Sequence, residues 1–242
     1  MTSRRDFLAA SAAAVAAVRF PSPPLPHPAM ASNTVLFQGD SITDAGRNRS
    51  RTGANDIAAL GSGYPLLLTA ELRERHPGND LQIFNRGVSG NTVPDLQARW
   101  QVDTIALAPT ILSILIGVND IWHTRAKTFS GTAATYEAAY AALLASTRTA
   151  LPGVRLVVME PFVTRVGAVD DTWFPEFDEY RAAAARVAKR SGALFVPLHE
   201  MLQDLGKHSS PAYWAADGVH PTLAGHQAIA HQWLRVVKLD DR

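Results

Sequence analysis

The sequence predicts an α/β domain, a three-layer α/β/α sandwich in which helices cover both faces of a parallel, doubly wound, five-stranded sheet. Five short apolar runs alternate along the chain with longer stretches that are typical of helices. The runs are apolar almost throughout, as expected for parallel strands that are buried on both faces. Because crossovers between parallel strands are right-handed, the alternation leads to helices on both sides of one sheet.

The expected strands and helices follow one another in a regular order from residue 34 onward. Strands are expected at residues 34–38, 81–85, 111–116, 154–159 and 193–197. Helices are expected at residues 64–75, 94–107, 133–151, 177–190 and 223–237. Two of these helices end at a turn signal, Pro77-Gly78 and Pro152-Gly153. The pattern holds no internal repeat, so residues 32–242 are expected to form one domain.

The composition is that of a globular protein and excludes several classes of site. The chain has 242 residues, of which 47% are hydrophobic, enough for one sizeable core. The formal net charge of +1 predicts no nucleic-acid partner, since such proteins carry a strong positive field. No cysteine is present, which excludes disulfides, a thiolate zinc site and a cysteine nucleophile.

Residues 1–31 are typical of a targeting segment. Arg4 and Arg5 stand just before an Ala-rich apolar run over residues 8–18, as in a twin-arginine signal, and several prolines follow. The run is too short for a permanent transmembrane helix, so no stable membrane insertion is expected after the signal is removed. We therefore expect export to the periplasm or the medium. The alternative is that translation starts at Met30 and yields a cytoplasmic enzyme.

A serine at the end of the first strand is the first candidate for chemistry. Residues 39–43 read Gly-Asp-Ser-Ile-Thr, after an apolar strand and before a turn into a helix. Ser41 is therefore expected at an exposed corner of the sheet, where backbone N–H groups also gather. The alternative is a Ser-Asp turn that only caps a helix, and this stretch alone does not separate the two.

The other end of the chain supplies a base for this serine. Asp217 lies three residues before His220. A serine is a poor nucleophile until a base takes its proton, and a carboxylate holds the histidine ring in the right tautomer. The sequence therefore predicts that Ser41, His220 and Asp217 form a catalytic triad.

Two polar loops that follow strands complete the predicted site. Residues 85–92 read Asn-Arg-Gly-Val-Ser-Gly-Asn-Thr, and residues 117–120 read Gly-Val-Asn-Asp. Open parallel sheets place their sites at these strand ends. An oxyanion hole needs N–H donors, so we expect the N–H groups of Ser41 and Gly87 and the side-chain amide of Asn119 to form one.

Together these stretches resemble the SGNH (GDSL) hydrolase family over nearly the whole chain from residue 35. The match is closest to bacterial acetylxylan esterases, on residues 39–44, 87–93, 98–100 and 219–221. The resemblance implies the flavodoxin-like type of doubly wound sheet. One position departs from the pattern: Ala216 stands where a relative carries an aromatic residue before the triad aspartate, and Trp214 comes two positions earlier.

The resemblance implies a serine esterase that hydrolyses short acyl esters, with acetyl groups on xylan or xylo-oligosaccharides as the expected substrate. We expect Asp40, Trp122 and Trp214 to contact the substrate; for Trp122 the alternative is a core position under its loop. No cofactor and no metal ion is expected, because acyl transfer to a serine needs neither. His199-Glu200 lacks the spacing of a zinc protease motif, since residue 203 is glutamine.

Two alternative functions remain open at this point. On the same scaffold the chain could be a lysophospholipase, a thioesterase or an arylesterase, since one fold hosts many substrates. It could also be a non-catalytic carbohydrate-binding protein, although the complete set of candidate catalytic residues argues against this. The sequence leaves open whether the protein forms a homo-oligomer.

Overall fold

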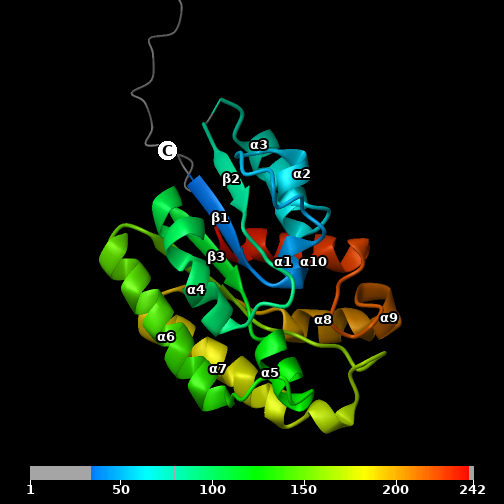
Figure 1. Ribbon diagram of the computed structural model, residues 1–242. Coiled ribbons are helices and arrows are strands. Elements are labelled where there is room, and N and C mark those ends of the chain that lie inside the picture. Colours follow the sequence, from blue (N-terminus) through cyan, green and yellow to red (C-terminus); the bar gives the residue numbers. More distant parts are fainter. Residues whose placement is uncertain (1–33, 79, 240–242) are drawn as a thin grey trace, which may run out of the picture.

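A parallel five-stranded sheet forms the centre of the computed structural model, which describes residues 34–78 and 80–239. Its strands are β1 (Thr34–Gly39), β2 (Gln82–Asn85), β3 (Ile111–Leu115), β4 (Arg155–Met159) and β5 (Leu194–Val196). They are hydrogen-bonded in the order β2-β1-β3-β4-β5, and every neighbouring pair is parallel (Figure 1). This is the flavodoxin-like order and confirms the expected fold class. The predicted targeting segment, residues 1–31, lies outside the described residues.

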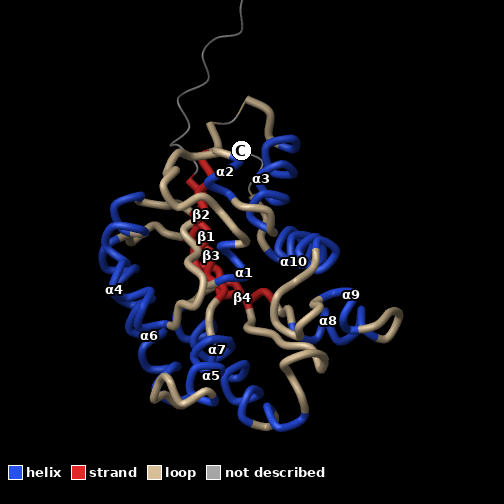
Figure 2. The backbone as a smooth tube through the Cα atoms, turned by 45° about the vertical axis from the view of Figure 1, so that its right-hand side comes forward, coloured by secondary structure: helices blue, strands red, loops and turns tan. Residues whose placement is uncertain are grey.

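Long helices cover the two faces of the sheet, as Figure 2 shows from the side. One face carries α3 (Tyr64–Arg75) and α10 (Leu223–Val236), and the other carries α4 (Val93–Asp103), α6 (Ala133–Ala150) and α7 (Glu176–Ser191). The long helices begin within one residue of the expected positions. Within residues 34–78 and 80–239, no helix combines the length and the apolar character needed to cross a bilayer.

Aromatic side chains join the helices to the sheet. On one face, Phe37 of β1 meets the rings of Tyr64 and Trp233 edge to face, with ring centroids 5.6 and 5.8 Å away. On the other face, the buried Trp100 of α4 donates from Nε1 to Thr147 Oγ1 of α6 at 2.9 Å. Burial of such large rings removes much apolar surface from water, so these contacts fix one helical layer against the sheet and join α4 to α6 in the other layer.

Several short helices were not expected from the sequence. They are α2 (Ile57–Leu60), α5 (Val118–Arg125), α8 (His199–Gly206) and α9 (Pro211–Trp214), whereas α1 (Ser41–Asp44) is the helix start that was expected after the first strand. Each has only one or two turns, too few for an apolar period to show in the sequence. The expected helix at 94–107 was also too long, because α4 ends at Asp103 and a 3₁₀ turn, Ile105–Leu107, follows. A second 3₁₀ turn spans Asp171–Trp173.

Candidate active site

Ser41 lies at the carboxyl edge of the sheet, at the start of α1. Asp40 caps this helix, because its Oδ1 accepts a hydrogen bond from the Ile42 N–H at 3.0 Å. Gly39 precedes it with φ +156°, and a Cβ there would lie 2.3 Å from the Leu115 carbonyl oxygen of β3. The close approach of β1 and β3 therefore requires glycine at this position, and the turn that it allows presents the Ser41 side chain outward.

Ser41, His220 and Asp217 form one chain of hydrogen bonds although Ser41 and His220 lie 179 positions apart in the sequence. Ser41 Oγ lies 2.8 Å from His220 Nε2, and His220 Nδ1 lies 2.7 Å from Asp217 Oδ2. The carboxylate accepts from Nδ1–H, so Nε2 is left as the acceptor for the serine hydroxyl. The structure thus brings together the three residues that the sequence singled out as a triad.

The Asp217 carboxylate is held in place and kept ionised. Its Oδ1 accepts from the backbone N–H groups of Val219, at 2.9 Å, and His220, at 2.7 Å. Partial burial raises the pKa of Asp217, but the hydrogen bonds from the His220 ring and from these N–H groups lower it more, so the net pKa lies below the usual range. A group that orients an imidazole must carry its negative charge, and this environment favours it.

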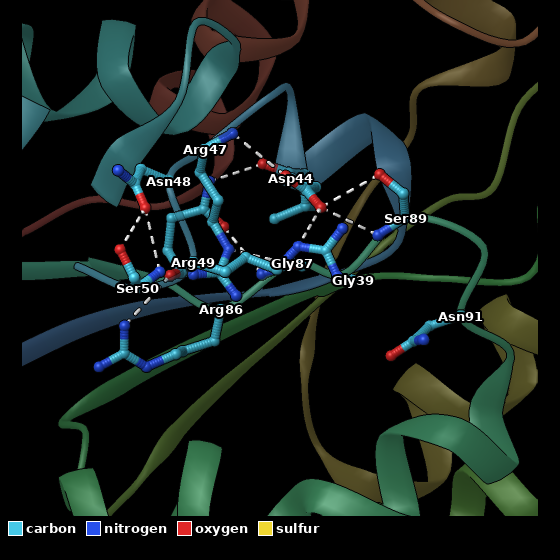
Figure 3. Close-up of polar contacts among 12 residues, drawn as sticks. Gly39, Asp44, Arg47, Asn48, Arg49, Ser50, Arg86, Gly87, Ser89 and Asn91 are labelled. Atoms are coloured by element: carbon cyan, nitrogen blue, oxygen red, sulfur yellow. Dashed lines mark hydrogen bonds and ion pairs between the residues drawn. The ribbon is translucent and has the colours of Figure 1, made fainter. Parts of the chain in front are cut away.

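A polar network joins α1 to the loop after β2, as Figure 3 shows. The buried Asp44 accepts at Oδ2 from Ser89, both from its N–H at 3.0 Å and from its Oγ at 3.1 Å. From the same region, Arg47 Nε donates to the Gly87 carbonyl oxygen at 2.7 Å. Because these bonds take up the carbonyl of Gly87 and the N–H of Ser89, the loop is fixed relative to the helix that carries Ser41.

The expectation that Gly87 supplies a free N–H to the oxyanion hole is wrong. Its N–H donates to the Asn85 side chain, with Oδ1 2.8 Å away. Gly87 is glycine for steric reasons, since a Cβ there would lie 2.4 Å from the Asp44 backbone nitrogen. In the same loop, Gly90 has φ +85°, open space around it and no partner for its N–H among the described residues. The sequence offered two glycines three residues apart, and only the hydrogen-bond pattern separates them.

Two further N–H donors of this region are available. The Ser41 N–H, at the first position of α1, has no hydrogen-bond partner among the residues that the structure describes. Asn119 lies in the first turn of α5 and is 8% exposed. Its Nδ2 donates one hydrogen to the Asn91 carbonyl oxygen at 3.1 Å. The second hydrogen of this amide remains for a ligand.

The three residues expected to contact the substrate, Asp40, Trp122 and Trp214, lie outside the lining of the cavity beside Ser41. Asp40 is 1% exposed and serves as the cap of α1, so its expected contact with substrate is wrong. Trp122 is half-buried and packs edge to face against Trp173, with ring centroids 5.5 Å apart. Trp214 is half-buried, and its Nε1 donates to Ser209 Oγ at 2.6 Å. Neither tryptophan lines the cavity beside Ser41.

A cavity of about 400 Å³ lies beside the nucleophile. Its walls include Ser41 and His220 together with Ile42, Pro221, Leu223 and His226. The sequence analysis missed this wall, although Pro221, Leu223 and His226 follow the triad histidine closely, just before and within the first turn of α10. Among residues 34–78 and 80–239 there is no group of three or more His, Cys, Asp or Glu side chains that could hold a metal ion.

Asp120→Asn is expected to make stability less sensitive to pH. Burial raises the pKa of Asp120 from 3.8 to about 7, with a smaller contribution from the nearby Asp40. In the pH window between 3.8 and about 7, Asp120 is protonated in the folded protein and ionised in the unfolded chain. The free energy of unfolding therefore falls as pH rises through this window. Asparagine does not titrate, yet its Oδ1 can still accept from the Val93 N–H, as Asp120 Oδ1 does at 3.1 Å.

Urea unfolding of both proteins at the two ends of that pH window measures this difference. The asparagine variant is expected to lose less stability towards neutral pH than the wild type. Equal slopes for the two proteins would show that Asp120 has the same protonation in the folded and unfolded states.

The comparisons with known proteins agree on one family. The sequence model of the GDSL-like Lipase/Acylhydrolase family matches residues 37–228. The chain is 36% identical over 207 residues to an acetylxylan esterase of Geobacillus stearothermophilus, covering 84% of this chain and 93% of that protein.

Solved structures give the same result. A GDSL-like protein from Parabacteroides merdae superposes with a TM-score of 0.83 at 43% identity, covering 84% of this chain and 94% of that one. An acetylxylan esterase from Geobacillus stearothermophilus superposes with a TM-score of 0.76 at 34% identity, covering 86% of this chain and 95% of that one. The chain therefore belongs to the GDSL-like lipase/acylhydrolase family and is a carboxylic ester hydrolase.

Proposed function

We propose that this protein is a serine esterase that removes acetyl groups from carbohydrate, with acetylated xylan or xylo-oligosaccharides as its substrates. The observation that carries the chemistry is the hydrogen-bond chain from Ser41 Oγ through His220 to Asp217, with links of 2.8 and 2.7 Å. The substrate class rests on the similarity to the acetylxylan esterase of Geobacillus stearothermophilus.

The first half of the reaction acylates Ser41. His220 Nε2 takes the hydroxyl proton while Oγ forms a bond to the ester carbonyl carbon, and the carbonyl electron pair moves onto oxygen. The imidazolium is stabilised by the ionised Asp217. As the carbonyl π bond forms again, the bond to the alcohol oxygen breaks and His220 protonates this leaving group. Water then repeats the steps on the acetyl-enzyme and releases acetate.

The developing oxyanion needs donors that are fixed in advance. The N–H groups of Ser41 and Gly90 and the second Nδ2 hydrogen of Asn119 meet this need, because none of them is used within the described part of the protein. Preorganised donors of this kind stabilise charge that exists only in the transition state. Gly90 therefore takes the role that the sequence analysis gave to Gly87.

Asn119→Ala is expected to lower kcat by about 10²–10³-fold, the usual cost of one lost oxyanion donor. KM should change much less, because the ground-state carbonyl oxygen is a weaker acceptor than the oxyanion. Steady-state kinetics on a small acetyl ester separates the two constants. A variant with a raised KM and an unchanged kcat would make Asn119 a residue of ground-state binding instead.

Hydrolysis of a panel of esters, measured as release of the carboxylic acid from each, tests the proposed function. The panel contains acetylated xylo-oligosaccharides, an aryl acetate, a lysophospholipid, an acyl thioester and long-chain 4-nitrophenyl esters, with Ser41→Ala as the control. We expect kcat/KM to be highest on the acetylated saccharides and to fall with acyl length. Faster turnover of the lysophospholipid, the thioester or the long-chain esters would overturn the substrate class. Absence of any turnover would overturn the catalytic proposal.

A further inference from the structure

His226 presents a hydrogen-bond donor to the cavity beside Ser41, a donor for which the proposed mechanism has no use. The imidazole comes from the first turns of α10 and is 9% exposed. Its Nδ1 accepts from the Tyr64 backbone N–H at 3.2 Å. Since a neutral imidazole carries one proton, this bond places the proton on Nε2. The ring also stacks on Tyr64, with centroids 6.4 Å apart, so its orientation is fixed.

The tautomer of His226 is stable at neutral pH, and Nε2 has no protein partner. Burial and, to a smaller extent, the charge of His220 together lower the pKa of His226 to about 4, so the ring stays neutral. Nε2 makes no hydrogen bond within the described residues. It does not belong to the buried polar atoms that lack a partner, so it is open to solvent. Nε2–H therefore reaches the cavity that the ring lines.

Ser62 supplies an acceptor in the wall of the same cavity. Its Oγ–H donates to the Ala45 carbonyl oxygen at 2.9 Å, which leaves the lone pairs of Oγ as acceptors. Its backbone N–H donates to the same carbonyl at 2.9 Å, so the loop is held independently of the side chain. Next to it, a Cβ on Gly63 would lie 2.8 Å from His226 Cε1, so glycine lets the imidazole approach this loop.

A donor and an acceptor in the wall of one cavity, with apolar side chains around them, fit a hydroxyl group on a carbon skeleton. The hydroxyl accepts from His226 Nε2–H and donates to Ser62 Oγ, while C–H groups of the same molecule pack on Pro221 and on the exposed Leu223. An alkyl or aryl alcohol would leave both polar groups of this wall without partners.

We propose that this cavity binds the leaving alcohol of the ester and that His226 and Ser62 recognise a hydroxyl group next to the ester carbon. The inference rests on the proposed function, because the oxygen that leaves must receive its proton from His220, which lines the same cavity as Ser41. The substrates selected in this way are acetyl esters of vicinal diols, the arrangement found in a sugar ring.

A matched pair of small esters tests this subsite: the monoacetate of trans-1,2-cyclohexanediol and cyclohexyl acetate. The two differ by one hydroxyl group on the carbon next to the ester. The wild type is expected to prefer the hydroxy-ester in kcat/KM by about tenfold, the effect of hydrogen bonds that only this ester can make. A wild type with equal kcat/KM for both esters would overturn the subsite.

Two variants test the assignment of the residues. Ser62→Ala removes the acceptor and keeps the backbone bond to Ala45. His226→Asn keeps an acceptor for the Tyr64 N–H and removes the Nε2–H donor. Each is expected to lower the preference for the hydroxy-ester by about three- to fivefold. The control is His231→Asn, an exposed histidine of α10 away from this cavity, which should keep the wild-type preference.

The possible outcomes separate this inference from the proposed function. An equal loss on both esters would assign His226 and Ser62 a structural role and overturn the subsite. Preserved preference in both variants would overturn it as well. If neither ester, nor any ester of the panel above, is hydrolysed by the wild type, the proposed function fails; if esters are hydrolysed without hydroxyl preference, only the subsite fails.

Discussion

Ser41→Ala is expected to lower kcat on any ester by at least about 10³-fold while the fold stays intact. Ser41 Oγ is the atom that forms the covalent bond to the acyl group, and no other side chain at the site takes its place. The substitution leaves the backbone of α1 unchanged, and the lost side-chain contact is the 2.8 Å bond to His220. Residual activity should come from the oxyanion donors and from binding alone.

Steady-state kinetics together with a thermal melt measures both parts of this prediction. The matched control is Ser50→Ala, an exposed loop serine whose Oγ donates to Asn48 Oδ1 at 2.7 Å, and it should keep wild-type kcat. A Ser41→Ala variant with wild-type kcat would remove this residue from the mechanism.

His220→Ala is expected to lose as much activity as Ser41→Ala, because a serine without its base stays protonated. The two residues act as one unit, so the double variant should be no slower than either single variant. Asp217→Asn should retain more activity than His220→Ala. Asparagine can still accept from the backbone N–H groups that Asp217 binds at 2.9 and 2.7 Å, but it cannot accept from the imidazole as a carboxylate does.

The expected loss for Asp217→Asn is at most about 10⁴-fold, the cost of the wrong imidazole tautomer in a serine triad. The Asp217 side chain is 46% exposed, so water can replace part of its interaction with the ring. Measurement of kcat/KM for both single variants and the double variant on one acetyl ester decides the matter. An active His220→Ala enzyme would contradict the serine-esterase mechanism, and an Asp217→Asn enzyme as fast as the wild type would contradict the triad.

The sequence predicted the sheet because its buried strands are near-continuous apolar runs, and it predicted the long helices because they fill the stretches between these runs. The apolar runs 111–116 and 154–159 contain β3 and β4, and the end of one crossover helix at Arg75 was predicted from the Pro-Gly turn that follows. One- and two-turn helices such as α5 carry no such signal. Their positions depend on tertiary contacts, for example the bond from the Asn119 side-chain amide of α5 to the Asn91 carbonyl oxygen at 3.1 Å.

The site was predictable where chemistry fixes the residue type and not where packing decides it. Serine, histidine and aspartate in one chain imply their roles, and the structure brings all three within hydrogen-bond distance. Between Gly87 and Gly90 the choice depends on the Asn85 side chain, whose contact no spacing reveals. Asp40 was misassigned for the same reason, since a polar residue beside a nucleophile is as easily a buried cap as a substrate ligand.

Covalent labelling of the protein tests the central claim, that Ser41 is an activated nucleophile, most directly. Diisopropyl fluorophosphate phosphorylates serines whose hydroxyl is activated by a base, and peptide mass spectrometry locates the adduct. We expect the adduct on the peptide that contains Ser41, activity lost in proportion to labelling, and no adduct at this position in the His220→Ala variant. Full esterase activity with Ser41 completely labelled would contradict the account.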